Sequence, residues 1–452
     1  MNFLDIMERA KGTEEITKEE WDLDKVVMTI HDLVEDNEFE WDKHELVLTD
    51  DALAQRYFVA AVELLNQIGV YNQSTGRVVK LTTAEVLDAA ARVKQQVTVG
   101  TGKDAYTFVP RRPEDRRLPG VVAGNPGCPM TEEIFRETVR SWAKEKTVDM
   151  VTCGSIVEVD GHPVEHASPS EVIALRREMK ILNEVCEEIG RPGIGRLAAE
   201  SSVSEIGDLA AMAPGGFHAG DAHLVSLNNE LIINNDYLIR VANAQDTPVL
   251  NASLACVMVG GLAGGAEGAT ICMIASMLAA NILYGADYHL CHPIHLKYIA
   301  TSTPECMWLQ SVVCRAFSVC APAVIVCDIY PKSGAGTKEL LYEVAANAIG
   351  ITVSGGHLEG VGSCDGLKPN CSGLEARLMG EVGKAVAAQG MRCDEAEKIM
   401  QELLEKYRHV FKDGNEGKPF REVYTEAGEP TGEWRKMYDE VVEELRELGV
   451  KL

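Results

Sequence analysis

The chain has 452 residues, of which 46% are hydrophobic and 25% charged, and its formal net charge at pH 7 is −26. This is the composition of a globular protein, and the negative charge argues against nucleic acid or an anionic membrane surface as a partner, because both would be repelled. The start of the chain is acidic and no apolar run is long enough to cross a bilayer, so we expect no signal peptide and no membrane span. The thirteen cysteines form no C-x-x-C pair, which predicts reduced thiols in a cytoplasmic protein.

The first hundred residues carry helix signals. Thr17 and Thr82 are each followed three residues later by glutamate, which is the pattern of a capping box. Residues 50–69 have apolar positions at helical spacing and end on Gly69, a residue typical of helix C-caps. A proline-rich span, Pro110 to Pro129, follows and predicts an ordered loop across the main domain. We therefore predict a helical N-terminal extension with a crossing loop over residues 1–125.

A strand and helix alternation begins near residue 148 and persists. Its central stretch runs from Asn251 to Lys297, where an apolar run, a turn with four glycines and an alanine-rich segment predict a buried strand followed by a packed helix. The predicted strands lie near 148–153, 193–198, 222–227, 250–258, 286–291, 322–328 and 350–355. The pattern predicts a (β/α)8 TIM barrel of the α/β class over 126–392, with C-terminal helices over 393–452. A doubly wound sheet is less consistent with the sequence, which lacks a G-x-G-x-x-G motif after the first strand.

Polar residues cluster where the predicted strands end. In a TIM barrel the active site lies at these ends. The side chains that follow or end the strands are Cys153, Leu197, Glu200, Asp221, His223, Leu224, Leu254, His289, Cys291, His292, His295, Cys327, Asp328, Tyr330, His357 and Glu359.

Four motifs resemble one family over essentially the whole chain. They are VGTGKDA at 99–105, GRPGIG at 190–195, the glycine turn at 260–265 and GLEARLMGEV at 373–382. The chain resembles the corrinoid-dependent monomethylamine methyltransferases of methanogens. The resemblance implies a (β/α)8 barrel that transfers a methyl group to the Co(I) corrinoid (cobalamin) of a separate protein docked over the barrel mouth, in methanogenesis or acetogenesis. It also implies a homo-oligomer, since the family assembles into one.

The sequence departs from this family where the family has its distinguishing residue, pyrrolysine. Leu197 occupies the pyrrolysine position, and Leu224 and Leu254 occupy the positions of two glutamates around it. Asp328 stands where the family has a glutamine, while Tyr330 is retained. The resemblance therefore implies that the imine chemistry that captures methylamine is absent and that the substrate is a different methylated compound.

Two chemistries fit the altered pocket. A quaternary or tertiary ammonium already carries its leaving group, so the three leucines with His223 and His292 would hold it, while Asp328 and Tyr330 act as catalytic residues that offer counter-charge and a ring face or hydroxyl. A methyl ether, alcohol or thioether needs a Lewis acid instead. His218, Asp221 and His292 are of ligand types suited to Zn²⁺, so zinc-dependent demethylation stays open at this point. A non-catalytic homologue that binds a small ligand is the third alternative.

Overall fold

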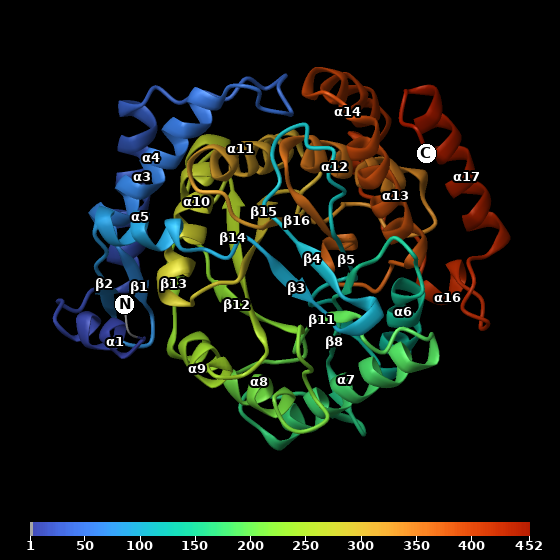
Figure 1. Ribbon diagram of the computed structural model, residues 1–452, viewed down its shortest axis with the longest axis horizontal. Coiled ribbons are helices and arrows are strands. Elements are labelled where there is room, and N and C mark those ends of the chain that lie inside the picture. Colours follow the sequence, from blue (N-terminus) through green and yellow to red (C-terminus); the bar gives the residue numbers. More distant parts are fainter. Residues whose placement is uncertain (1–2) are drawn as a thin grey trace.

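The computed structural model describes residues 3–452 and contains a closed barrel of eight parallel strands (Figure 1). The strands in order around the barrel are β5 (Val121–Ala123), β7 (Met150–Val151), β11 (Gly195–Ala198), β12 (Ala222–Leu227), β14 (Leu250–Val259), β15 (Tyr288–His295), β16 (Ile325–Ile329) and β17 (His357–Gly360). The prediction of a (β/α)8 barrel is confirmed.

Helices surround this barrel. They are α6 (Glu132–Ala143), α7 (Pro169–Glu188), α8 (Glu205–Ala211), α9 (Asn235–Ala244), α10 (Ala266–Leu283), α11 (Pro304–Cys320), α12 (Lys338–Ser354) and α13 (Gly373–Gln389). Among the described residues, α10 is the one helix that is long and apolar enough to span a membrane, but 83% of it is buried inside the fold. It packs against β14, α11 and the N-terminal helices, so its apolar surface is already covered by protein.

Two barrel strands lie elsewhere than the sequence predicts. The predicted strand 350–355 belongs to the last turns of α12, which ends at Gly355 in the left-handed conformation (φ 94°), and β17 begins only at His357. A short apolar run fits a buried helix as well as a strand, so periodicity does not separate the two. The first strand, β5, lies inside the proline-rich span that the sequence predicts to be loop, because three apolar residues are too few to give a signal.

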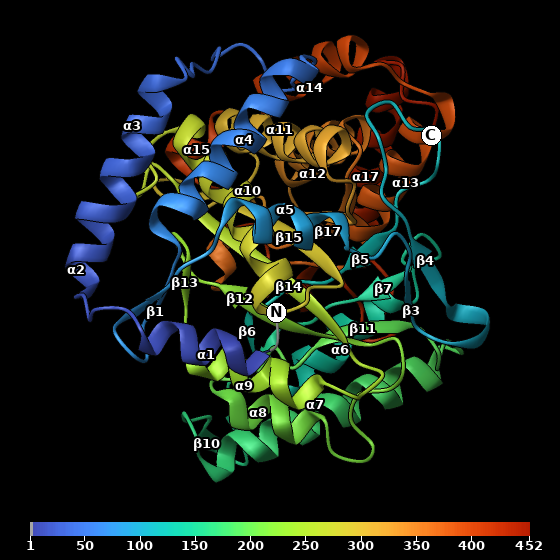
Figure 2. The same ribbon diagram turned by 60° about the vertical axis from the view of Figure 1, so that its left-hand side comes forward.

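The N-terminal extension covers one side of the barrel, over α10 and α11 (Figures 1 and 2). Both predicted capping boxes are present, at Thr17 with Glu20 and at Thr82 with Glu85, and Gly69 ends its helix with φ 76°. The extension also contains two short strands, one of which pairs with a strand that follows β12. Its elements are α1 (Phe3–Lys11), α2 (Lys18–Glu20), the π-helix Trp21–Val27, α3 (Met28–Asp36), α4 (Asp51–Ile68), β1 (Val70–Asn72), β2 (Arg77–Val79) and α5 (Thr83–Ala91), with β13 (Ile232–Ile233) as the partner of β1.

A hairpin closes the amino end of the barrel. Its strands β3 (Val97–Val99) and β4 (Tyr106–Phe108) pair antiparallel. Phe108 is fully buried and stacks on Tyr288, the first residue of β15, with ring centroids 6.2 Å apart. Because the hairpin belongs to the same buried cluster as the barrel interior, the interior is reached from the opposite, carboxyl end.

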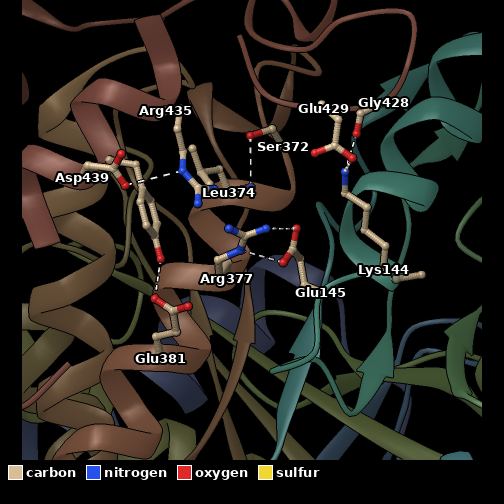
Figure 3. A network of polar contacts seen from close by, with 12 residues as sticks. Lys144, Glu145, Ser372, Leu374, Arg377, Glu381, Gly428, Glu429, Arg435 and Asp439 are labelled. Atoms are coloured by element: carbon tan, nitrogen blue, oxygen red, sulfur yellow. Dashed lines mark hydrogen bonds and ion pairs between the residues drawn. The ribbon is translucent and has the colours of Figure 1, made fainter. Parts of the chain in front are cut away.

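The C-terminal helices are tied to the barrel by charged and polar contacts (Figure 3). Within the barrel itself, Arg377 on α13 donates two hydrogen bonds, of 2.7 and 3.0 Å, to the carboxylate of Glu145, which follows α6. Tyr438 donates to Glu381, also on α13, and Lys144 pairs with Glu429. The helices of this region are α14 (Cys393–Tyr407), α15 (Val410–Asp413), α16 (Phe420–Val423) and α17 (Gly432–Glu447).

Arg111 fixes the crossing loop that precedes β5. Its guanidinium is 3% exposed and donates only to backbone carbonyls, those of Thr352, Gly356, Asp115 and Arg117, at 2.6 to 3.1 Å. Among the described residues, none of the hydrogen bonds that Arg111 donates goes to a carboxylate, and burial lowers the pKa of Arg111 to about 10. The loop is therefore ordered by one buried side chain that satisfies four main-chain acceptors.

We expect Arg111→Ala to lower the free energy of unfolding by about 3 kcal/mol, because it leaves buried carbonyls without donors. Denaturant unfolding followed by circular dichroism measures this change. The matched control is Arg112→Ala, since Arg112 is exposed, and a surface substitution of this kind shifts stability by less than about 0.5 kcal/mol. Equal effects of the two substitutions would contradict the role of Arg111.

Candidate active site

One row of side chains crosses the carboxyl end of the barrel interior. Paired residues on parallel strands face the same side, so Cys256 on β14 lies beside His292 on β15, and Asp328 on β16 beside Glu359 on β17. His292 Nδ1 is hydrogen-bonded to Asp328 Oδ2, which joins the two pairs. The row thus brings a thiol, an imidazole and two carboxyl groups together at the end where TIM barrels carry their active sites.

The structure brings together three of the predicted site residues, because His292 contacts both Asp328 and Tyr330. The Tyr330 ring lies edge-on to the imidazole of His292, with centroids 5.4 Å apart. Burial, followed by nearby acidic groups, raises the pKa of Tyr330, so the phenol keeps its proton. The Asp328 side chain is almost fully buried, and its Oδ1 accepts no hydrogen bond.

Glu200 and Glu359 join this site, although the sequence analysis noted them only as strand-end residues. Glu359 is 1% exposed, and burial, then Asp328, then Glu200 raise its pKa well above the ordinary value. Glu200 follows β11, and burial, Glu178 and Asp328 raise its pKa to about 8. Asp328 thus raises the pKa of both glutamates, as expected of carboxyl groups that share one interior. The rule that polar strand ends meet at the barrel mouth was the signal that could have found both glutamates.

The three leucines lie in the barrel interior below this row. Leu197 is buried, and Leu224 and Leu254 are partly buried against the same apolar cluster. Leu254 lies in one row with Leu290 and Val326. Along each strand, this row is two residues before the row that contains His292 and Asp328. The interior is therefore apolar beneath and polar at its mouth.

His223, predicted to bind substrate, does not face the interior. It is fully buried between the barrel and α8, where its Nδ1 lies 3.1 Å from the carboxylate oxygens of Asp208 and its Nε2 lies 2.6 Å from Asn251 Oδ1. Side chains alternate along a strand, so His223 must point outward once its neighbour Leu224 points inward. The prediction placed both on one face, which that alternation forbids.

The three zinc candidates, His218, Asp221 and His292, are not brought together. Asp221 accepts hydrogen bonds from Arg196 at the amino end of β12, and His218 contacts the same guanidinium. Strand β14 pairs with both β12 and β15, so the two predicted ligands can be compared along it. Ala222 pairs with Leu250 and His292 with Cys256, which places Asp221 beside residue 249 and His292 beside residue 256. At about 3.3 Å per residue, these two positions are roughly 20 Å apart along the strands. Within residues 3–452, no group of three His, Cys, Asp or Glu side chains is arranged to hold a metal ion.

Buried carboxylates on α7 position the loop that carries Glu200. Glu178 accepts hydrogen bonds from the backbone N–H groups of Glu200 and Ser201, at 3.1 and 2.8 Å. About two turns before it on the helix, Glu171 accepts hydrogen bonds from the backbone N–H groups of Val203 and Ser204 at 2.8 and 2.6 Å. The loop after β11 is thus held by side chains of the helix behind it, which fixes where the Glu200 carboxyl group sits.

The protein is a TIM barrel with buried carboxyl groups at the carboxyl end of its strands, where the enzymes of this fold have their active sites. A family model described as monomethylamine methyltransferase MtmB matches residues 1–450. The chain therefore belongs to this family of methyltransferases, and the resemblance noted in the sequence is confirmed.

Individual relatives agree over the full length. The chain is 34% identical to monomethylamine methyltransferase MtmB2 of Methanosarcina acetivorans over 99% of its own length and 97% of that protein. It is also 34% identical to monomethylamine methyltransferase MtmB of Methanosarcina mazei, with the same coverage. The crystal structure of the Methanosarcina barkeri monomethylamine methyltransferase superimposes with a TM-score of 0.96 at 32% identity, covering all of this chain and 98% of that one.

We expect Glu178→Ala to lower the free energy of unfolding by about 2–4 kcal/mol, because two buried N–H groups lose their acceptor. Chemical denaturation measures the loss. Glu184→Ala on the same helix is the control, since Glu184 is part of a partly exposed ion pair with Arg136 and such pairs contribute about 1 kcal/mol or less. An unchanged stability of Glu178→Ala would contradict the assigned role.

Proposed function

We propose that this enzyme moves a methyl group from a small cationic N-methyl compound, other than monomethylamine, to the Co(I) corrinoid of a partner protein. The observation that carries the proposal is Asp328, a carboxylate at the open end of the barrel with one oxygen that has no hydrogen-bond partner. A buried anionic group in this condition is stabilised by a cation. A methylated ammonium supplies that charge.

The proposed substrate differs from that of the named relatives because of Leu197. The resemblance places this residue where the family has pyrrolysine, and an aliphatic side chain has no electrophilic group with which to capture a primary amine. Leu224 and Leu254 extend the same apolar wall. An apolar wall favours N-methyl groups through burial of their carbon surface. The carboxylate of Asp328, in the row above, stabilises the positive charge of the ammonium.

The reaction needs little from the protein beyond binding and orientation. In the methyl transfer, the bond between the methyl carbon and nitrogen breaks, its electron pair stays on nitrogen, and the carbon forms its new bond with the electron pair that Co(I) supplies. The leaving group is then a neutral amine. The apolar interior would exclude water, and Asp328 with Tyr330 would hold the nitrogen so that the methyl group points to the open end.

Exposed apolar side chains around the mouth support a protein partner. Val157, Val203, Leu296 and Leu367 are 45 to 70% exposed, and each belongs to a loop that follows a barrel strand. Apolar groups around the rim of a site are typical of surfaces that bind another protein. A homo-oligomer remains a prediction from the resemblance, and a cytoplasmic location remains a prediction from the unpaired cysteines. Sedimentation at micromolar concentration would test the oligomer.

The function is tested by mixing the purified chain with a Co(I) corrinoid protein and a panel of methylated amines, ethers, alcohols and thioethers. Methylation changes the absorbance spectrum of the corrinoid, so transfer is read directly. We expect transfer from a secondary, tertiary or quaternary N-methyl cation. A panel without transfer, together with a tightly bound ligand, would instead favour the non-catalytic alternative.

The separation of His218 and Asp221 from His292 supports a metal-free site over the zinc-dependent alternative. We therefore expect a chelator to leave methyl transfer unchanged and the purified protein to contain far less than one equivalent of zinc by elemental analysis. Loss of transfer on chelation, restored by added zinc, would overturn this expectation and revive demethylation of an ether, alcohol or thioether.

We expect Asp328→Asn to weaken binding of the cationic substrate by roughly 1–3 kcal/mol, since the amide removes the counter-charge but keeps the shape. Isothermal titration calorimetry measures the change. Asp287→Asn is the matched control, because Asp287 is a largely buried aspartate just before β15, at the amino end of the barrel, where it pairs with Lys94. Equal losses in both variants would show that the effect is not specific to the site.

A further inference from the structure

Among residues 3–452, three carboxyl groups in the barrel interior each have one oxygen without a hydrogen-bond partner. These atoms are Glu200 Oε1, Asp328 Oδ1 and Glu359 Oε2. In folded proteins, buried polar atoms are nearly always hydrogen-bonded, and each exception calls for a physical reason. Asp328 and Glu359 are 2% and 1% exposed, so open solvent does not supply that reason.

The three groups lie close enough to act on each other. Asp328 and Glu359 are paired residues of adjacent strands, and the pKa of Glu359 is raised by burial and then by Asp328 and Glu200. The same carboxyl group of Asp328, after burial and Glu178, raises the pKa of Glu200. Burial and the neighbouring carboxyl groups disfavour negative charge on Glu200 and Glu359, so both retain their protons at pH values where an exposed carboxyl group has lost its proton.

The surrounding charged groups do not neutralise this set. Glu178 already accepts the N–H groups of the Glu200 loop, and Arg240 acts on Glu200 from α9, where its guanidinium donates to the Ser204 carbonyl. Only Asp328 has a basic partner in the row, His292. The titratable and charged groups that interact electrostatically with the three carboxyls are Glu178, Arg240, Tyr288, His292, Cys256 and Tyr330, together with the buried thiols of Cys153, Cys291 and Cys327.

We infer that Glu200, Asp328 and Glu359 form one carboxyl cage that binds an ammonium ion bearing at least one N–H group and releases about one proton as it does so. The inference rests on the proposed function and assigns to Glu200 and Glu359 a role in selecting the substrate.

The exchange follows from charge balance. A cation that binds among buried carboxyl groups is stabilised if one of them gives up its proton, because the net charge of the site then stays the same. The departing proton goes to solvent, and no bond to carbon changes in this step. Below the pKa of Glu200, about 8, the cation must compete with a bound proton. The apparent affinity for the cation therefore rises about tenfold per pH unit in this range and stays constant above that pKa.

The unpartnered oxygens also distinguish between ammonium ions. They are acceptors, so secondary and tertiary ammonium ions can donate N–H hydrogen bonds to them, and these charge-assisted bonds are strong. A quaternary ammonium has no N–H group and leaves the same oxygens unsatisfied. We therefore expect dimethylammonium and trimethylammonium to bind more tightly than tetramethylammonium by at least tenfold.

Calorimetric titration of the full chain with these three ions tests the inference, without any corrinoid protein. Titrations in buffers of different ionisation enthalpy give the number of protons released, and we expect about one. Between about pH 6 and pH 8 the affinity for dimethylammonium should rise with a slope near one. The double variant E200Q/E359Q should release no proton and should flatten the slope, and circular dichroism checks that it is folded.

Glu375→Gln is the matched control. Glu375 is buried at the start of α13 and its pKa is raised to about 7 by burial, but its oxygens accept hydrogen bonds from Ser372 outside the barrel interior. This variant should keep the full proton release. No release in the unaltered protein, or tighter binding of tetramethylammonium, overturns the cage, as does a failure of all three ions to bind. Methyl transfer that persists with any of these outcomes leaves the proposed function standing.

Discussion

The alternation of side chains along eight parallel strands decides the role of almost every polar residue in this barrel. At each strand, one residue faces the narrow interior and the next faces a helix. Leu224 faces inward and His223 outward; Asp328 faces inward and its neighbour Cys327 contacts Cys314 of α11 at 3.5 Å. The chemistry available to a ligand is therefore restricted to every second residue of each strand.

The outward set explains why histidines and aspartates that look like ligands are structural. His223 joins α8 to β14 through Asp208 and Asn251, and Asp221 is satisfied by Arg196. His289, on the outer face of β15, is hydrogen-bonded to Ser253, and burial lowers its pKa to about 3. Each of these groups is satisfied by the protein itself, whereas the inward carboxyls are not.

Sequence reasoning predicts the barrel and most of its helices because their signals are local. The alanine-rich segment that the sequence predicts to be a packed helix between Asn251 and Lys297 is α10, at Ala266–Leu283. The three-residue strand β5 has no such signal, since its position depends on pairing with β17 and β7 across the closed barrel. The alternation of side chains along one strand could also have separated His223 from Leu224. The register that pairs Asp328 with Glu359 joins two segments about thirty residues apart and requires the structure.

The placement of negative charge gives the site a direction. The resemblance assigns the family's two glutamates to the positions of Leu224 and Leu254, on β12 and β14. In this chain those strands present leucine, while the unpartnered carboxyl oxygens belong to β16, β17 and the loop after β11. The carboxyl groups of this chain thus lie above the leucines, nearer the open end of the barrel. A cation held by these carboxyl groups would keep its remaining methyl groups toward Leu224 and Leu254, where their carbon surface is removed from water, and would leave the methyl group that is transferred toward the open end. The orientation of a bound ammonium would then follow from an apolar lower part and a carboxyl-lined upper part of the same barrel interior, without a covalent link to the protein.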